Sequence, residues 1–570
     1  MELTGAQILL ESLGREGVDV FFGFPGGAVI DIYHQIPKYP NLTHMLVRHE
    51  QGAIHMADGY ARATGKVGVC LVTSGPGATN TVTGIATAYM DSIPVVIITG
   101  QVSTPLIGND AFQEVDIVGI TRPCTKHNYL VKDVTKLAKT IKEAFYLARS
   151  GRPGPVLIDL PKDVQQAACA YSYPKGEVTM RSYNPHYAPN VKQVRKVAEL
   201  IRSSERPVLY AGGGVIGGEA SAELTKLAKT YSIPVTATLM GLGSFPGDDP
   251  LWLGMLGMHG TFAANHSMAN SDLILAVGAR FDDRVTSKVS EFATQATIVH
   301  IDIDPTSIQK NVTVHVPVVA GTREFLTALN AEMSRTAKEA AKQKSWVSKQ
   351  KWLTQIGKWK KEHPLTYKPA KKGGFIKPQS VVEAIHKITK GDCILATEVG
   401  QHQMWAAQFF TYKKPRTILT SGGLGTMGYG FPAAIGAQAA FPGKLVIDLA
   451  GDGSIQMCIQ ELATAMCYKL PVKIVILNNG YLGMVRQWQE LFYGKNYCAT
   501  CLDVAPDFVK LAQAYGADGF RVSDGADLEK TLRKAFKTSK PCIVDVAVDP
   551  QENVYPMVPA GKSITDMLLI

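Results

Sequence analysis

The sequence predicts an α/β protein with three doubly wound parallel-sheet domains. Short apolar runs alternate with segments of helical periodicity along most of the 570 residues, and this alternation is typical of strands joined by crossover helices. Hydrophobic residues make up 46% of the chain and charged residues 19%, which allows a large core and excludes general disorder. At roughly 100 to 200 residues per domain, the length fits several domains.

The apolar runs fall into three blocks, residues 1–180, 190–335 and 375–550, of which the first and third are similar in size and pattern. Runs of this kind are predicted as buried strands of parallel sheets. The predicted strands are Val18–Phe24, Val67–Val72, Val95–Thr99 and Val156–Asp159 in the first block; Val208–Ala211, Val235–Ala237, Leu273–Val277 and Ile298–Ile301 in the second; and Cys393–Thr397, Leu445–Leu449, Lys473–Leu477 and Cys542–Val546 in the third.

Two segments between the blocks are predicted as linkers. Ala170–Pro189 is polar and contains proline, and residues 336–374 combine a helical pattern with many lysines before they end in glycines. Residues 551–570 follow the last block as a tail. Much of the net charge of +10 lies between Lys338 and Lys377. Because no nucleic-acid recognition motif accompanies these lysines, they are interpreted as a solvated helical surface, and no nucleic-acid partner is expected.

The composition also indicates the compartment. No stretch approaches the roughly 18 uncharged apolar residues of a membrane span, and the first residues lack the pattern of a signal peptide. The nine cysteines are an odd number scattered along the chain, which indicates reduced thiols. Cys498 and Cys501 form a single CxxC without a second pair or nearby histidines, so neither a zinc site nor a redox role is favoured. We expect a cytoplasmic protein without a membrane partner.

The strongest functional motif lies in the third block, where two predicted strands end in polar residues. Val446–Ala450 leads into the turn Gly451–Ser454, and the next apolar run ends in Asn478 and Asn479. Open α/β sheets bind ligands at the carboxyl ends of their strands. The glycines of the turn let backbone amides approach a phosphate, and Asp452 and Asn479 offer oxygen ligands that suit Mg²⁺. The turn alone is equally explained as a tight turn with an Asp cap, but the paired motif favours a phosphate and Mg²⁺ site.

Two features of the first block are weaker signals. Glu50 follows an apolar run and precedes the predicted helix Ala53–Arg62, a position that the helix dipole favours for any acidic residue. The glycine-rich turn Ser74–Asn80 opens the next helix, which indicates a close approach of the backbone to some neighbour.

The second block contains a glycine-rich turn, Gly212–Gly217, that fits the pattern GxGxxG after a strand. The NAD form of this fingerprint needs an acidic residue about 20 positions later, and the next strand, Val235–Ala237, ends without one. Two later strand ends offer a different nucleotide site, because Arg280 can reach a phosphate and Asp302 can accept a hydrogen bond from a ribose or adenine edge. Each of these two charges is also explained as a capping or surface residue.

Together these motifs resemble the catalytic subunits of the acetohydroxyacid synthase (acetolactate synthase) family of thiamine diphosphate (ThDP) enzymes, over nearly the whole chain. The turn Gly451–Ser454 followed at this spacing by Asn478 and Asn479 is similar to the ThDP fingerprint. The stretches Arg280–Thr286 and Met484–Gln489 distinguish this family from other ThDP enzymes. The other diagnostic stretches are Phe24–Ala28, Arg48–Arg62, Ala111–Glu114 and Gly151–Pro155.

The resemblance implies a pyrimidine domain, a central FAD-binding domain and a diphosphate domain, together with a set of site residues. The implied catalytic residues are Glu50, which activates the cofactor, Gln113 and Lys162. The implied ThDP contacts are Glu50, Val399, Gly400, Gln401, His402, Gly425, Met427, Gly451, Asp452, Gly453, Ser454, Asn479, Tyr481, Gly483 and Met484. The implied Mg²⁺ ligands are Asp452, Asn479 and the backbone carbonyl of Tyr481. The implied contacts of a structural FAD are Arg152, Gly212, Gly213, Leu256, Gly257, Met258, His259, Gly278, Arg280, Phe281, Asp282, Asp302 and Ile303. The implied substrate contacts are Gly27, Phe112, Arg284, Met484 and Trp488.

The implied reaction is decarboxylation of pyruvate on ThDP and transfer of the hydroxyethyl carbanion to a second 2-ketoacid, the first common step of branched-chain amino acid biosynthesis. Pyruvate as acceptor gives 2-acetolactate, and 2-ketobutyrate gives 2-aceto-2-hydroxybutyrate. Arg284 can pair with the acceptor's carboxylate, and Trp488 can line the space for its extra methyl group. The resemblance further implies a homodimer or a dimer of dimers, in which two chains share one ThDP, and allows a small regulatory subunit.

Two other functions are weighed against this one. A pyruvate oxidase would also use ThDP and FAD, but Arg284 and Trp488 argue against it. A catalytically inactive relative that serves as a binding module would not need Glu50, Asp452 and Asn479, all of which are present.

Overall fold

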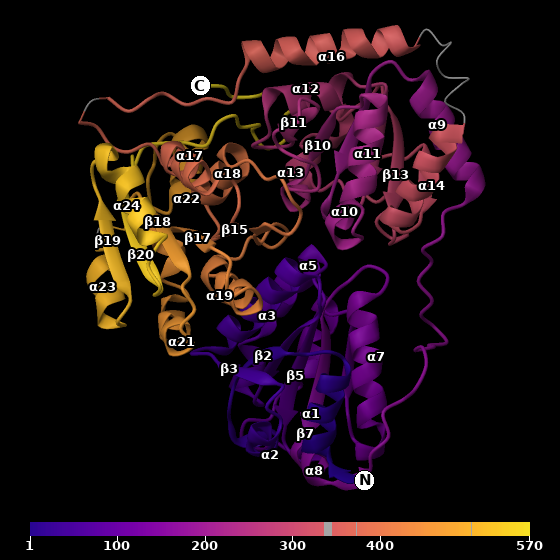
Figure 1. Ribbon diagram of the computed structural model, residues 1–570, viewed down its shortest axis with the longest axis vertical. Coiled ribbons are helices and arrows are strands. Elements are labelled where there is room, and N and C mark those ends of the chain that lie inside the picture. The colour runs from indigo at the N-terminus through magenta and orange to yellow at the C-terminus, as the bar shows by residue number, and fades with distance from the viewer. Residues whose placement is uncertain (336–344, 372, 503) are drawn as a thin grey trace.

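Three parallel sheets, each with six strands among the residues that the structure describes, organise the chain (Figure 1). The computed structural model describes residues 1–335, 345–371, 373–502 and 504–570. Counted along the chain, the strands of the first and third sheets follow the same order, 2-1-3-4-6-5, and those of the second sheet follow 3-2-1-4-5-6. The predicted α/β class with three doubly wound sheets is confirmed.

The first sheet carries helices on both faces. Side chains alternate between the faces of a strand, so Ile98 packs with α1 (Gly5–Arg15) and α7 (Leu137–Arg149), whereas Ile97 packs on the side of α3 (Glu50–Thr64) and α5 (Val82–Asp91). In spatial order, the strands are β3 (Thr43–Leu46), β2 (Val20–Phe24), β4 (Gly68–Val72), β5 (Val95–Gln101), β7 (Val156–Pro161) and β6 (His127–Leu130).

The second sheet is covered by α9 (Val191–Ser203), α11 (Ser221–Tyr231) and α14 (Thr322–Arg335) on one face and by α12 (Phe262–Asn270) and α16 (Ser345–Glu362) on the other. In spatial order, its strands are β11 (Trp252–Met255), β10 (Val235–Ala237), β9 (Pro207–Ala211), β12 (Leu273–Val277), β13 (Thr297–Asp302) and β14 (Val316–Val319).

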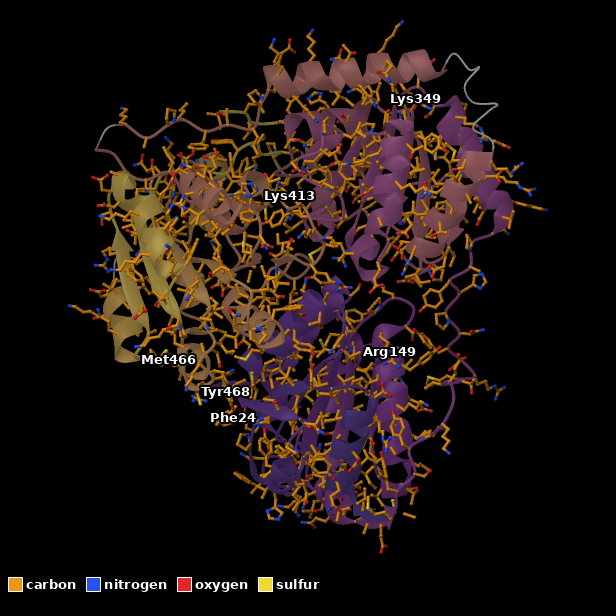
Figure 2. The ribbon with its side chains drawn as sticks, in the orientation of Figure 1. Phe24, Arg149, Lys349, Lys413, Met466 and Tyr468 are labelled. Carbon is orange, nitrogen blue, oxygen red and sulfur yellow. The ribbon has the colours of Figure 1, made fainter. Side chains whose placement is uncertain are left out.

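Helix α16 lies in the lysine-rich segment between the second and third blocks, of which residues 336–344 and Lys372 are outside the described residues. Its side chains Trp352 and Ile356 are buried against the second sheet. Lys349, labelled in Figure 2, is 5% exposed and donates its ammonium to the carbonyl of Ile201 at 2.6 Å. The interpretation of this stretch as a solvated surface is therefore wrong at Lys349, because the packed face of the helix buries it.

The third sheet repeats the arrangement of the first. Its one face packs against α17 (Pro378–Thr389), α18 (Gln401–Phe409) and α24 (Leu528–Ala535), and its other face against α19 (Gly430–Ala440) and α23 (Phe508–Ala514). In spatial order, the strands are β16 (Ile418–Leu419), β15 (Ile394–Thr397), β17 (Val446–Gly451), β18 (Lys473–Asn478), β20 (Cys542–Ala547) and β19 (Asp518–Val522). Within the described ranges, no helix is long and apolar enough to cross a membrane.

The first and third sheets share one hydrophobic core, because α3 and α19 pack against each other between them. The two backbones lie close, since a Cβ on Gly59 would be 2.5 Å from the Cα of Ala433. Figure 2 shows Phe24 and Tyr468 at the junction of the two sheets, where the Tyr468 hydroxyl accepts the backbone amide of Leu46 at 2.7 Å. This contact fixes the relative position of the two sheets within one chain.

Candidate functional site

Two turns at the carboxyl edge of the third sheet bring Asp452 and Asn479 together. Strands β17 and β18 are parallel neighbours, with Gly451 opposite Leu477, so the turns that follow them lie side by side. Asp452 begins the short helix α20 and is 1% exposed. Burial raises the pKa of Asp452 to about 6, while hydrogen bonding from backbone amides, that of Asn479 among them, acts against this increase.

Asn479 belongs to a polar cluster with Gln401. Its Oδ1 accepts the backbone amide of Tyr481 at 3.0 Å, and its Nδ2 donates to Oε1 of Gln401 at 3.4 Å. A Cβ on Gly483 would collide with the same oxygen of Gln401, so any larger residue there would displace the Gln401 side chain. Gln401 begins α18 directly after β15, which neighbours β17. The cluster therefore joins the ends of three strands.

His402 lies between two glycine turns of this edge. A Cβ on either Gly400 or Gly451 would be 2.9 Å from Cε1 of its ring. Burial lowers the pKa of His402 to about 3, so the imidazole is neutral near pH 7. Met427 approaches the same turn, with its Cε 4.0 Å from the Cβ position of Gly453. Gly425 lies beside Val399, whose Cγ1 is 3.9 Å from the Cβ position of this glycine.

Buried polar atoms without a partner indicate what this edge can bind. In the part of the chain that the structure describes, Oδ2 of Asp452, Oγ of Ser454 and Nε2 of His402 have no hydrogen-bond partner, which is costly unless a ligand supplies one. No group of three or more His, Cys, Asp or Glu could hold a metal among the described residues. A cation here would depend on a carboxylate, an amide and a carbonyl plus oxygens of its ligand, as Mg²⁺ commonly does. These residues fit Mg²⁺ and a diphosphate.

Glu50, the first residue of α3, is 9% exposed at the carboxyl edge of the first sheet. Its Oε2 accepts Nδ2 of Asn80 at 2.9 Å, and its Oε1 is 3.2 Å from the Cβ position of Gly77. The predicted glycine-rich turn after β4 therefore packs against this carboxyl. A helix-capping role does not explain the contact with Asn80, which comes from a separate turn.

Other residues predicted near the reacting centre lie along the same edge. Lys162, which follows β7, donates its Nζ to the carbonyl of Gly27, which follows β2, at 3.1 Å. Gln113 has a φ of 57°, and its Cα is 3.0 Å from the Cβ position of Gly75 in the glycine-rich turn. Phe112 is 88% exposed in the single chain. The structure thus gathers these four predicted residues around the first sheet, not around the third.

The second sheet reverses its strand order between β9 and β12, and a glycine turn follows each of these strands. The amide of Gly214 donates to the carbonyl of Gly278 at 3.0 Å, and a Cβ on Gly214 would be 2.7 Å from the Cα of Gly278. Open α/β sheets bind nucleotides in the crevice at such a reversal. Arg280 extends from the second turn and donates its Nη1 to the carbonyl of Met90 at 2.7 Å, so this crevice faces the first sheet.

Two predicted FAD contacts have structural roles in the chain itself. Phe281 is 1% exposed and packs edge-on against Tyr210 at 5.2 Å between ring centres, so its ring belongs to the core. Asp282 accepts the amide of Arg284 at 3.0 Å and caps the short helix α13 (Asp283–Thr286). Asp282 is therefore a helix cap.

Arg152 and Asp302 lie where the first and second sheets meet. Arg152 donates its Nη1 to Asp304 at 3.0 Å, and burial raises the pKa of Asp302 to about 6. The stretch Leu256–His259 contacts the tail, because the amide of Val558 donates to the carbonyl of Met258 at 2.8 Å. Gly212 and Gly213 follow β9, and Ile303 follows β13.

Arg284 and Trp488 face each other although they come from the second and third blocks. The guanidinium carbon of Arg284 is 6.0 Å from the ring centre of Trp488, within the range of a cation–π contact. Trp488 lies on α22 (Gly483–Phe492), one turn after Met484. The Arg284 side chain is 59% exposed, so a carboxylate can approach its charge while an apolar group contacts the indole.

A buried ionic network joins α3, the end of α5 and the start of α19, and it was not predicted from the sequence. Arg62 donates to Asp58 at 2.6 Å and to Asp91 at 2.9 Å, and all three side chains are at most 5% exposed. The Tyr429 hydroxyl donates to Asp58 at 2.6 Å. Asp58 and Arg62 are spaced i,i+4 on α3, which signals an ion pair, but nothing in the sequence shows that the pair is buried against α19.

Three sequence models of thiamine pyrophosphate enzyme domains match the chain. The N-terminal TPP binding domain matches residues 3–120, the central domain residues 194–329 and the C-terminal TPP binding domain residues 398–546. The central match spans the second sheet, and the N-terminal and C-terminal matches each span most of the first and third sheets, since β15 (Ile394–Thr397) precedes the C-terminal match.

Curated relatives match from end to end. The acetolactate synthase large subunit of Haemophilus influenzae is 48% identical over 574 residues, which cover 100% of this chain and 98% of the relative. Acetolactate synthase isozyme 3 large subunit of Escherichia coli (strain K12) is 48% identical over 572 residues with the same coverage. An acetolactate synthase of Mycobacterium bovis is 48% identical over 567 residues, or 99% of this chain and 91% of the relative. The chain therefore belongs to the acetolactate synthase large-subunit family of thiamine pyrophosphate (ThDP) enzymes.

Proposed function

We propose that the chain condenses pyruvate with a second 2-ketoacid, pyruvate or 2-ketobutyrate, with release of CO₂. The products are 2-acetolactate and 2-aceto-2-hydroxybutyrate, which begin the branched-chain amino acid pathway. The relatives are named acetolactate synthases, and one observation in this chain carries the proposal. The guanidinium carbon of Arg284 lies 6.0 Å from the ring centre of Trp488. The pair therefore combines a carboxylate-binding group with an apolar wall, the two features that a 2-ketoacid acceptor needs.

ThDP, when bound, supplies the electron sink for the decarboxylation. The proposed Mg²⁺ ligands are Asp452, Asn479 and the backbone carbonyl of Tyr481. The amides of the turn Gly451–Ser454 hold the diphosphate. Oδ2 of Asp452 and Oγ of Ser454, which have no partner among the described residues, support this assignment, because bound ligands would satisfy both. The other proposed contacts of this cofactor are Val399, Gly400, Gln401, His402, Gly425, Met427, Gly483 and Met484.

Glu50 is proposed to hold a proton at the pyrimidine ring nitrogen of the cofactor. Asn80 fixes one of its carboxyl oxygens at 2.9 Å, which leaves Oε1 in a defined position for a second hydrogen bond. A carboxyl that bonds to a ring nitrogen sets the acid–base state of that ring. Gln113 and Lys162 are proposed to orient the ketoacid, and Lys162 brings positive charge to this edge, where Gly27 accepts its hydrogen bond.

We also propose a structural FAD in the crevice of the second sheet. The close contact of Gly214 with Gly278 makes room for a dinucleotide backbone beside the turns. Arg280 is placed to bind a phosphate, and Asp302 to accept a hydrogen bond from a ribose or adenine edge. A flavin absorption spectrum of the purified protein would support this part, and loss of the bound flavin in Arg280→Ala would locate it.

A homodimer is proposed as the smallest active unit, with Glu50 of one copy completing the Asp452 site of the other. Several apolar side chains next to proposed site residues are exposed in the single chain: Phe112 at 88%, Leu424 at 44%, Met457 at 51% and Val485 at 50%. A second copy would cover them. The Haemophilus and Escherichia relatives are named large subunits, so a smaller partner is proposed for this chain as well.

Complementation tests the shared site. Glu50→Gln and Asp452→Asn are each expected to be inactive alone. If two chains share one site, mixed dimers contain one intact site, and random exchange restores about one quarter of the wild-type activity. If each chain holds a complete site, mixing restores none, and the shared-site proposal is wrong.

The reaction itself is tested by a colorimetric acetoin assay on acid-treated product, with pyruvate, ThDP and Mg²⁺. Anaerobic formation of acetolactate without flavin reduction is expected. Flavin reduction by pyruvate together with acetate formation would instead identify an oxidase. Absence of any product from the cofactor-loaded protein would exclude the proposed reaction.

A further inference from the structure

The CxxC pair of the third block lies on a surface segment that supports the proposed Mg²⁺ loop. Cys498 and Cys501 are cysteines without a disulfide, and both residues are exposed. The segment runs antiparallel to the loop after β18, because the amide of Leu482 donates to the carbonyl of Thr500 and the amide of Leu502 donates to the carbonyl of Gly480, both at 2.8 Å. Tyr481 and Cys501 are therefore paired directly.

The segment also contacts the turn that is proposed to bind the diphosphate. Cδ2 of Leu482 and Cδ1 of Leu502 lie 2.9 and 3.1 Å from the Cβ position of Gly453. Thr500 is 2% exposed and donates its hydroxyl to Gln489 at 3.0 Å. The segment is thus packed on the site from one side, while Cys498 and Cys501 are exposed residues.

The chain turns between the two thiols. Ala499 has a φ of 53°, a left-handed conformation that shortens the path from Cys498 to Cys501 relative to an extended strand. Gln489 donates to the carbonyl of Cys498 at 2.9 Å, which holds the first end of the turn on α22. A disulfide needs Cα atoms about 4.4 to 6.8 Å apart, and the bend at Ala499 brings the two ends closer to this range than an extended strand would.

We propose that Cys498 and Cys501 are a redox-sensitive dithiol that forms an intramolecular disulfide and thereby weakens Mg²⁺ binding in the adjacent loop. One thiol attacks a low-molecular-weight disulfide such as oxidised glutathione and releases one glutathione, and the second thiol then displaces the other. Two protein thiols are oxidised and one glutathione disulfide is reduced to two glutathiones. The proposed effect on Mg²⁺ binding rests on the proposed function, whereas formation of the disulfide does not.

The link from the disulfide to the metal passes through two backbone hydrogen bonds. Closing the ring restricts Thr500 and Cys501, whose backbone pairs with Tyr481 and Leu482. Weakening one such bond is expected to raise the Mg²⁺ concentration for half-saturation roughly threefold to tenfold. A structural zinc at the pair is disfavoured, because the described residues offer no third His, Cys, Asp or Glu within reach.

Mass spectrometry after exposure to oxidised glutathione tests the disulfide. The wild-type chain is expected to lose about 2 Da in the peptide that holds both cysteines. Cys498→Ser and Cys501→Ser should instead retain one glutathione, because no second thiol displaces it. Cys467→Ser is the matched control, since Cys467 is a single exposed cysteine elsewhere on the third block, and it should close the disulfide as the wild type does. Stable glutathione adducts on the wild-type pair would overturn the proposal.

Calorimetric titration of Mg²⁺ in the presence of ThDP tests the consequence without relying on activity. The oxidised wild type should bind Mg²⁺ more weakly than the reduced protein, and dithiothreitol should restore binding. The serine variants should lose this response, and Cys467→Ser should keep it. Equal Mg²⁺ affinity in fully oxidised and reduced protein would refute the regulatory role. A chain without acetolactate synthase activity but with this mass change and Mg²⁺ response would refute only the proposed function.

Discussion

Asp91, at the end of α5, accepts the backbone amide of Gly423 at 2.7 Å and so ties the first sheet to a loop of the third. The same carboxylate accepts the amide of Gly422 at 3.1 Å and is paired with Arg62 at 2.9 Å. The loop continues to Met427, which approaches the turn proposed to bind the diphosphate. The buried carboxylate of Asp91 therefore positions the loop that leads to Met427, within one chain.

Asp91→Asn should lower both stability and cofactor affinity. The variant keeps one acceptor oxygen but leaves Arg62 with Asp58 as its only carboxylate partner among the described residues, which is expected to cost about 1–3 kcal/mol. The matched control is Asp248→Asn, in the exposed pair with Lys413 (2.8 Å; Lys413 is labelled in Figure 2), where the expected change is within about 0.5 kcal/mol. Calorimetric melting and ThDP titration measure both effects. Equal behaviour of the two variants would show that the buried network does not position the loop.

Glu50→Gln should abolish most of the activity while ThDP still binds. The amide can accept the hydrogen bond from Asn80 but cannot hold the proton that the ring nitrogen needs, so a loss of about 100-fold or more is expected. Product formation and ThDP binding are measured separately. The control Glu114→Gln alters a half-buried carboxylate that accepts the amide of Gly108 at 3.1 Å and should be fully active. Normal turnover in Glu50→Gln would remove the proton-holding role.

Trp488→Leu should reduce the preference for 2-ketobutyrate over pyruvate as acceptor. The indole is the ring that Arg284 approaches at 6.0 Å, and the fit of one methylene is worth about 1–3 kcal/mol. Competition between the two acceptors, with both products quantified, measures the ratio. Phe492→Leu removes the ring that packs edge-on against Trp488 at 5.8 Å and should change the ratio less. An unchanged ratio in Trp488→Leu would exclude Trp488 from the acceptor pocket.

The strands that sequence patterns predicted and those that they missed differ in their place in the sheets. The twelve predicted strands are the four inner strands of each sheet. These are covered on both faces, so their sequences are continuous apolar runs. Of the eight described strands that were missed, β1 (Glu2–Thr4) and β8 (Ala168–Ala170) form a separate antiparallel pair. The other six, β3, β6, β11, β14, β16 and β19, lie at the edges of the three six-stranded sheets. His127–Leu130, for example, has no buried residue, so its sequence carries no apolar run.

The site was predictable where topology alone brings residues together. Asp452 and Asn479 each follow a strand, and those strands are parallel neighbours, so their proximity follows from the α/β pattern. The pairing of Arg284 with Trp488 joins two separate sheets, and only the family resemblance indicated it. The Asp91–Arg62 pair was missed because burial between α3, α5 and α19 depends on how sheets pack, which local patterns do not encode.

Two further carboxyl groups lie beneath the start of α19. Glu398 accepts the amides of Gly428 at 2.6 Å and Phe431 at 3.0 Å. Asp448 is fully buried, and neither of its oxygens has a hydrogen-bond partner in the described ranges. Burial, together with the nearby charge of Glu398, raises the pKa of Asp448 well above its usual range. The folded protein therefore holds a proton on Asp448 that the unfolded chain releases.

This proton makes the stability of the third block depend on pH in a defined direction. Because the folded pKa of Asp448 exceeds the unfolded value, its contribution is complete below about pH 4 and is lost as pH rises toward the folded pKa, by up to about 1.4 kcal/mol per pH unit. Asp448→Asn removes the ionisation, so its melting temperature should exceed that of the wild type increasingly from pH 5 to pH 8.

The control Asp549→Asn should behave oppositely. Burial raises the pKa of Asp549, but hydrogen bonds from Lys377 and the amide of Gln551, together with the positive charges of Lys377 and Arg486, outweigh it and lower this pKa. The variant should therefore be less stable than the wild type at pH 8 and approach it in acid. A constant difference between Asp448→Asn and the wild type across this range would show that Asp448 binds no extra proton in the folded state.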